Sequence, residues 1–371
     1  MKQGGNMQKI VHVLLYGLLL AVVFTGMMGI THFIAEEEER AAQETERQLA
    51  LQRAADKEAE EQKQLQLENT RTVLVKNLPV YQEKKIVKQK ADSDRVTLSY
   101  GERMTLLEED RLYAKIQTES GQTGYVWKDG IGKLQQTDHG LQNPNAPDTQ
   151  PPFVVFIDVE EAVQQEQTSP QERDAQDTIS LNTALKLEKK LESRGYVVIM
   201  ARRSPENSLS DAKSAELASQ IEADASIRIC TDYLTDVSDD DAGNPADDSP
   251  DNQTNNGTGG TLQRAAAYCS TKQSAFPAAR YAADSKKLGK YLLKSYTKET
   301  GFTNAGVLGT DEYPGIQKSK TPAIVLKTEP VSGPENAGRM ERAKFQAKMA
   351  DGIADGLDAY FRWKMEQTAA I

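Results

Sequence analysis

Residues that commonly hold metals or attack substrates are scarce in this chain of 371 residues. It contains three histidines: His12 and His32 lie in or beside an apolar run, and His139 is the last. Its two cysteines, Cys230 and Cys269, are too few for a disulfide scaffold or a zinc ribbon. Zinc is usually bound by imidazole or thiolate, so any metal chemistry after residue 139 would have to do without imidazole.

An aspartate-rich stretch at 235–260 is a second place where metal chemistry could be sought. Residues 231–263 contain eight Asp and no Lys or Arg. No acidic residue occupies the closing position of an EF-hand-type loop, so the pattern does not predict a calcium site. The composition instead predicts a disordered, solvated insertion.

The charge of the chain is unevenly distributed. The net charge is −10. Residues 36–70 contribute −6 and residues 231–263 contribute −8, which leaves the remainder slightly positive. No concentrated basic face is visible in the sequence, and nucleic acid is therefore not an expected partner.

An apolar run of 25 residues without charge, at 10–34, predicts a transmembrane helix. Lysines precede it and four glutamates, at 36–39, follow it. The positive-inside rule makes residues 1–9 a cytoplasmic tail and places the rest of the chain outside. A cleaved signal peptide would have a shorter apolar region and an A-x-A-like site. We therefore expect an uncleaved single-pass anchor in the cell membrane.

Residues 36–70 are rich in helix formers and contain neither Gly nor Pro, which predicts a helical stalk. Leucines are too sparse for a sustained heptad seam, so a solvated single helix is favoured, with a coiled-coil dimer as the alternative.

Residues 72–134 change to short alternating strands and tight turns, among them Ser120-Gly121 and Asp129-Gly130. The string YGERMTLLEEDRLYAKIQTESGQTGYVW resembles bacterial SH3-like barrels. That resemblance implies a small all-β domain that binds cell-wall glycan or peptide, with Tyr113 and Tyr125 as wall-binding candidates. A spacer without a ligand is the alternative. Residues 135–152, dense in Asn, Pro, Asp and Gln, predict a linker.

From residue 153 onward, short apolar strands alternate with amphipathic helices. The expected strands are FVVFI (153–157), YVVIM (196–200), SIRIC (226–230) and TPAIVL (321–326). The pattern predicts an α/β domain over 153–361, with a mostly parallel or mixed sheet that helices cover on both faces. Ligand sites in such sheets lie at the carboxyl ends of the strands.

In order along the chain, 153–361 resembles the zinc-dependent N-acetylmuramoyl-L-alanine amidases. The resemblance is carried by FVVFID, by TISLNTALKLEKKLESRGYVV, by LSDAKSAELASQIEADASIRIC and by PAIVL. It implies the amidase-type fold and action on peptidoglycan. The order of anchor, wall-binding barrel and amidase-like domain fits an extracytoplasmic protein.

The positions at which the family holds zinc and its catalytic base are all substituted. Carried over, the two histidine ligands fall on Glu161 and Cys230, and the glutamate ligand falls on Gln176. The catalytic glutamate falls on Lys327, which places a positive charge where the family has a base. Zinc, the cofactor of the related family, is therefore not expected here.

Three interpretations of this site remain open. The first is a pseudoenzyme that keeps the fold but has lost zinc and hydrolysis. The second is an active amidase with a metal site rebuilt from Asp158, Glu161, Cys230 and Glu329. The third is a structural scaffold of an envelope assembly. Peptidoglycan and the membrane are the expected partners, other envelope proteins are further candidates, and Cys230 and Cys269 are either bonded or buried separately.

Overall fold

A computed structural model of the protein describes residues 4–84, 96–133, 135–137, 140–142, 152–160, 170–205, 209–231, 264–328 and 337–369. The chain divides into two compact units, Met1–Glu68 and Asn69–Ile371. The second unit contains a β-domain (residues 70–133) and an α/β domain (residues 152–369).

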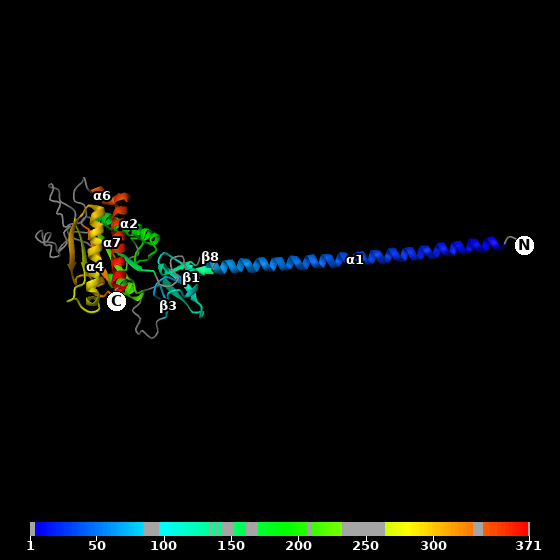
Figure 1. The fold of residues 1–371 in the computed structure, drawn as a ribbon, viewed down its shortest axis with the longest axis horizontal. Coiled ribbons are helices and arrows are strands. Elements are labelled where there is room, and N and C mark those ends of the chain that lie inside the picture. The colour runs from blue at the N-terminus through cyan, green and yellow to red at the C-terminus, as the bar shows by residue number, and fades with distance from the viewer. Residues whose placement is uncertain are drawn as a thin grey trace. The chain divides into compact units, whose positions relative to one another are not determined.

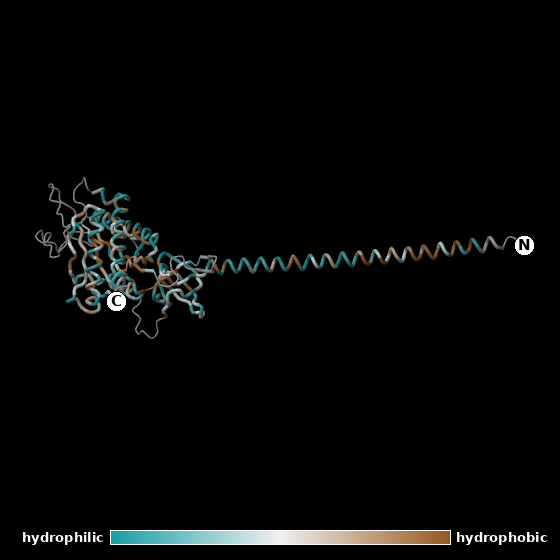
Figure 2. Tube along the Cα trace, in the orientation of Figure 1, coloured by the Kyte–Doolittle hydropathy of each residue, from teal (hydrophilic) through white to brown (hydrophobic). Residues whose placement is uncertain are grey.

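The first unit is the helix α1 (Gly4–Asn69), in which the predicted anchor and the predicted stalk are continuous. Its most apolar window of 18 residues has a mean hydropathy of 2.3, and Figure 2 shows this apolar stretch. Within the described residues, it is the helix that is long and apolar enough to cross a membrane. The polar part carries ion pairs at i,i+4, such as Arg40–Glu36 at 3.8 Å. Such exposed pairs support a solvated helix only weakly.

The described residues of the β-domain form seven strands. They are β1 (Thr70–Val73), β2 (Asn77–Pro79), β3 (Thr97–Ser99), β4 (Arg103–Glu109), β5 (Tyr113–Thr118), β6 (Thr123–Trp127) and β7 (Ile131–Lys133). Five form an antiparallel sheet in the order β6-β5-β4-β1-β7, and β2 pairs with β3. The expected turn at Ser120-Gly121 joins β5 to β6, and Gly121 has a φ of 85° that favours glycine. Within the segment expected as a linker, β8 (Gln135–Thr137) and β9 (Gly140–Gln142) form a short antiparallel pair.

The α/β domain confirms the expected sheet flanked by helices. Its strands are β10 (Val154–Val159), β11 (Val197–Met200), β12 (Ala225–Thr231), β13 (Arg264–Cys269), β14 (Thr303–Gly309) and β15 (Ala323–Thr328). Its helices are α2 (Pro170–Ser193), α3 (Asp211–Gln220), α4 (Ala282–Thr300), α5 (Pro314–Gln317), α6 (Ala337–Glu341) and α7 (Ala343–Ala369). The sheet order is β11-β10-β12-β15-β13-β14. The pairing of β13 with β15 is antiparallel and the other pairings are parallel, so the sheet is mixed.

Alternation along the strands divides the core between the two faces of this sheet. On one face, Val155, Ile157, Ile227 and Leu326 pack in one cluster with residues of α2, α4 and α7. The helices α4 and α7 lie side by side on this face (Figure 1). Two glycines of α7 permit their close approach. A Cβ atom at Gly352 would lie 2.6 Å from Cα of Tyr296, and one at Gly356 would lie 2.5 Å from Cα of Leu292.

The opposite face of the sheet packs against α3 and against the β-domain. Val154 and Phe156 of β10 share a buried cluster with Leu217 of α3 and with Trp127 and Val126 of β6. The Trp127 side chain is completely buried. Its indole Nε1 donates a hydrogen bond of 3.1 Å to the carbonyl oxygen of Met200. The β-domain and the α/β domain therefore share one hydrophobic core.

Polar contacts surround this shared core. The Asp129 carboxylate accepts a hydrogen bond of 3.0 Å from the backbone N–H of Met200 and forms an ion pair of 2.7 Å with Arg203. Lys76 Nζ lies 2.8 Å from the Asp224 carboxylate. These contacts fix the orientation of the β-domain on the sheet, because each joins a strand or turn of one domain to a defined atom of the other.

We predict that Trp127→Ala lowers the free energy of unfolding by about 3–5 kcal/mol, the usual cost of truncating a buried aromatic side chain. Because the core is shared, the β-domain and the α/β domain should lose stability together, in one cooperative transition followed by circular dichroism in denaturant. Leu107→Ala, at a side chain that is 48% exposed, is the control and should change little. Separate transitions of the two domains in the wild-type chain would contradict the shared core.

Candidate functional site

Three adjacent parallel strands bring the sequence-predicted site residues to one end of the sheet. In the register of β10, β12 and β15, Asp158 pairs with Arg228, and Cys230 pairs with Lys327. Because alternate residues of a strand point to the same face, Asp158 is on the face that packs against α3. Arg228, Cys230 and Lys327 are on this face as well. All four side chains are buried.

Arg228 is the centre of a buried ion-pair network. Its Nε and Nη2 donate to Oδ2 of Asp158 at 3.1 and 2.6 Å, and its Nη1 pairs with the carboxylate of Asp211 at the start of α3. Oδ1 of Asp158 accepts the backbone N–H of Val159 at 2.9 Å. Burial alone would lower the pKa of Arg228, but the two carboxylates raise it above its ordinary value, so the guanidinium stays charged.

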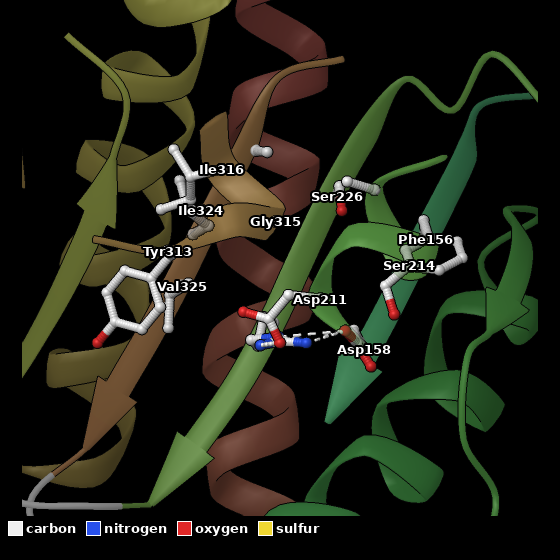
Figure 3. Close-up of a pocket in the computed structure, with 13 residues that line it drawn as sticks. Phe156, Asp158, Asp211, Ser214, Ser226, Tyr313, Gly315, Ile316, Ile324 and Val325 are labelled. Carbon is white, nitrogen blue, oxygen red and sulfur yellow. Dashed lines mark hydrogen bonds and ion pairs between the residues drawn. The ribbon is translucent and has the colours of Figure 1, made fainter. Parts of the chain in front are cut away.

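This network lines a small cavity between the sheet, α3 and α5, which Figure 3 shows. Tyr313, Gly315 and Ile316 close it from the side of α5. Its volume is about 20 Å³, which is room for a water molecule and not for a sugar. The cavity is therefore part of the packing around Arg228 and not a substrate groove.

Of the positions carried over from the amidase resemblance, Cys230 and Lys327 lie near the carboxyl ends of β12 and β15. Glu161 and Glu329 lie outside the described residues. Gln176 is buried in α2, one turn before Ser180, whose hydroxyl lies 2.9 Å from the hydroxyl of Thr231. The structure thus brings Asp158, Cys230 and Lys327 to one face, and it places Gln176 on the helix that covers the other face of the sheet.

Glu160 is a member of this cluster that sequence reasoning missed. Its backbone N–H donates to the carbonyl of Ile229 at 3.1 Å, and its carboxylate accepts a hydrogen bond from the Cys230 thiol. Burial raises the pKa of Glu160, while Arg228, Cys230 and Lys327 act in the opposite direction. The sequence contained a signal for a polar cluster at this place. Arg228 and Cys230 alternate with isoleucines in one strand and so share a face, where a polar partner is expected.

The described residues at this edge do not fit the zinc set of the amidase family. Within the described part of the chain, no three side chains of His, Cys, Asp or Glu are close enough together to hold a metal ion. Asp158 is already paired with Arg228. The positive charges of Arg228 and Lys327 would also repel a divalent cation brought to Cys230 and Glu160.

The two cysteines are not bonded to each other. Cys230 belongs to the cluster on the α3 face, and Cys269 belongs to the core cluster on the face of α2, α4 and α7. Burial raises the pKa of the Cys269 thiol to about 11. They are buried separately, on opposite faces of the sheet.

The wall-binding candidates Tyr113 and Tyr125 lie on adjacent strands of the β-domain. Both are half-buried. The Tyr113 ring packs edge-on against Trp127, with 5.0 Å between ring centroids, so it supports the tryptophan that docks onto the sheet. Burial, with Asp110 nearby, raises the pKa of Tyr113 to about 12. Lys84 Nζ lies 5.5 Å from the centre of the Tyr125 ring. Wall binding by these tyrosines stays a prediction.

We predict that Arg228→Met lowers the free energy of unfolding by about 3–5 kcal/mol, because it leaves the buried carboxylate of Asp158 and the partly exposed carboxylate of Asp211 without their counter-ion. Replacing Asp158 and Asp211 by Asn in the same chain should recover part of the loss. Arg194→Met is a matched control: Arg194 also pairs with two carboxylates, of Asp355 and Asp358, but at the surface. That change should cost less than about 1 kcal/mol. Equal losses for both variants in urea denaturation would contradict the assigned role.

Comparisons with known proteins identify relatives of the α/β domain. The sequence model of a family described as N-acetylmuramoyl-L-alanine amidase matches residues 168–359. No curated protein sequence matches the chain. Among solved structures, an N-acetylmuramoyl-L-alanine amidase from Clostridium difficile 630 is 19% identical, with a TM-score of 0.43 over 57% of this chain and 97% of that one.

Two further solved structures are similar at the same level. The catalytic domain of an N-acetylmuramoyl-L-alanine amidase from Bacillus (Paenibacillus) polymyxa var. colistinus is 18% identical, with a TM-score of 0.42 over 57% of this chain and 98% of that one. An amidase from Clostridioides difficile, solved in complex with a lipoprotein, is 16% identical, with a TM-score of 0.39 over 57% and 98%. Because the family match covers more than half of its 371 residues, the chain belongs to the N-acetylmuramoyl-L-alanine amidase family.

Proposed function

We propose that this protein is a membrane-anchored, cell-wall-associated member of the amidase family that has lost zinc and hydrolysis. It acts as a peptidoglycan-binding or regulatory module outside the cytoplasm. The single observation that supports the loss most directly is the pairing of Lys327 with Cys230 at the edge of the sheet where the family resemblance places a ligand and the base.

The chemistry of that pair argues against hydrolysis. In the family, a metal supplies a hydroxide at neutral pH and a neighbouring carboxylate accepts its proton. Here Lys327 occupies the position of that carboxylate, so the acidic side chain that would accept the proton is missing. The Cys230 thiol donates a hydrogen bond to Glu160, and the charges of Arg228 and Lys327 also act on that carboxylate.

A rebuilt metal site is the second candidate, and Cys230 beside a carboxylate is the observation that favours it. A thiolate and carboxylates can bind a metal. Asp158 is one of the four proposed ligands of that site, and its carboxylate is already paired with Arg228. The rebuilt metal site is therefore the weaker candidate.

The anchor is the second part of the proposal. The apolar part of α1 has the length and hydropathy of a membrane span, and a signal sequence near the N-terminus would share these properties. The apolar run of 25 residues is longer than the apolar region of a signal peptide and does not end in an A-x-A-like site, which supports an uncleaved anchor. The β-domain, which we interpret as an SH3-like barrel, would then be carried outside with the α/β domain.

We predict that the full chain, purified in a mild detergent, contains no stoichiometric zinc and releases no peptide from muropeptides when zinc is added. The reason is the absence of imidazole after His139 and the lysine at position 327. Metal content is measured by mass spectrometry, and product release by chromatography beside an active amidase. One tightly held zinc per chain that Cys230→Ala removes, and that the matched control Cys269→Ala retains, would instead establish a rebuilt site.

We further predict that protease added to intact, wall-stripped cells digests the second unit, residues 69–371, and spares the cytoplasmic tail and the membrane segment, residues 1–34. The charge asymmetry around that segment orients the chain with its long part outside. Blotting with antibodies against the α/β domain, with a cytoplasmic protein as the integrity control, follows the digestion. Full protection of the α/β domain in cells that stay intact would exclude the surface topology.

A further inference from the structure

We propose that a lysine ridge on α4 binds a linear anionic polymer of the cell envelope, one with regularly spaced phosphodiester groups. The ridge consists of Lys286, Lys290, Lys294 and Lys298, which recur at every fourth residue. Residues four apart on a helix are neighbours on its surface. The four ammonium groups therefore form one row along the helix.

The packing of α4 directs this row toward solvent. The opposite side of the helix is buried: Leu288, Leu292 and Tyr296 pack in the main core cluster. Gly289 approaches Val307 of β14 and Ala267 of β13. All four lysines are exposed. The ridge is thus a fixed surface feature, because the helix that carries it is held by its buried side.

The positive charge of the ridge has no evident structural purpose. Like charges at i,i+4 destabilise a helix, and the ridge contains three such pairs in succession. Within the described residues, Lys286, Lys294 and Lys298 form no ion pair. The neighbouring surface between α2 and α7 is different, since Lys190 pairs there with Asp351 and Arg194 pairs with Asp355. A chain of net charge −10 therefore carries a short row of four lysines on one helix.

The spacing of the row fits a polyol phosphate. Four residues of helix advance about 6 Å along the axis and turn by about 40°, so the four lysines span roughly 18 Å in a slowly winding row. An extended chain advances about 3.5 Å for every three bonds. In poly(glycerol phosphate), six bonds separate successive phosphorus atoms, which puts the charges about 7 Å apart. Each lysine can thus face a successive phosphate with little adjustment of its flexible side chain.

A wall polymer is favoured over a membrane surface for two reasons. A single row of charges matches a linear ligand, whereas a bilayer presents a plane of headgroups. In addition, 33 helical residues, Glu36–Glu68, separate the apolar segment from the second unit along the chain. The choice rests on the extracytoplasmic placement proposed above, and it is independent of whether the α/β domain hydrolyses peptidoglycan.

The test uses the full chain in nanodiscs of zwitterionic lipid, titrated with fluorescent poly(glycerol phosphate) at several salt concentrations. The ridge variant carries four substitutions: Lys286→Gln, Lys290→Gln, Lys294→Gln and Lys298→Gln. The matched control removes the same charge from exposed lysines elsewhere: Lys189→Gln, Lys213→Gln, Lys318→Gln and Lys344→Gln. A second probe is a nanodisc containing phosphatidylglycerol and no protein.

The ridge variant should bind the polymer at least tenfold more weakly. Its slope of log affinity against log salt should be smaller by about three, since each phosphate contact contributes roughly 0.7. Its thermal midpoint should not fall, because like-charge repulsion is relieved, and the control variant should bind as the wild type does.

Equal binding by the ridge variant and the wild type would overturn the proposal. Tighter binding to the phosphatidylglycerol nanodisc than to the polymer would assign the ridge to a membrane and overturn the choice of ligand. Whether the protein hydrolyses muropeptides does not affect these binding measurements.

Discussion

Arg228 lies in the middle of the sheet and is held between the carboxylates of Asp158 and Asp211. A charge buried at that depth is tolerated only when its partners are fixed. The network therefore holds β10, β12 and the first turn of α3 in one arrangement. Because α3 supplies part of the surface on which the β-domain packs, the same network supports the interface between the two domains. The position of Trp127 depends on it indirectly.

The same network constrains what the edge of the sheet can do chemically. Asp158 belongs to the motif by which the family resemblance begins, but here its oxygens are occupied by Arg228 and by the backbone of Val159. Lys327 and Arg228 contribute positive charge to a place where a metal would otherwise contribute it. Burial raises the pKa of Glu160, and these two side chains act in the opposite direction.

Much of the architecture could be predicted from the sequence. The runs FVVFI, YVVIM, SIRIC and TPAIVL are rich in β-branched residues, and each corresponds to a strand. The strands β13 and β14 could not be found in this way, because RAAAYC and TNAGVLG are dominated by small residues with weak strand preference. Pairing with the rest of the sheet, which sequence periodicity does not report, decides their conformation.

The candidate site was predictable only in part. Cys230 and Lys327 were identified through the family resemblance, but the carboxylate that reaches Cys230 in the described structure is Glu160, next to the carried-over position Glu161. Docking of the β-domain left no sequence signal either. Val126 and Trp127 look like ordinary residues of a short strand in the sequence. Only the structure shows the hydrogen bond from the Trp127 indole to the Met200 carbonyl oxygen.

The junction between α1 and β1 has a mechanical consequence. The helix ends at Asn69 and the strand begins at Thr70, so no slack lies between them. β1 is an interior strand, hydrogen-bonded to β4 on one side and to β7 on the other. Tension applied along α1 would therefore enter a strand that is secured on both sides. From there it would pass through the shared core into the amidase-family sheet, and the second unit would bear the load as a single body.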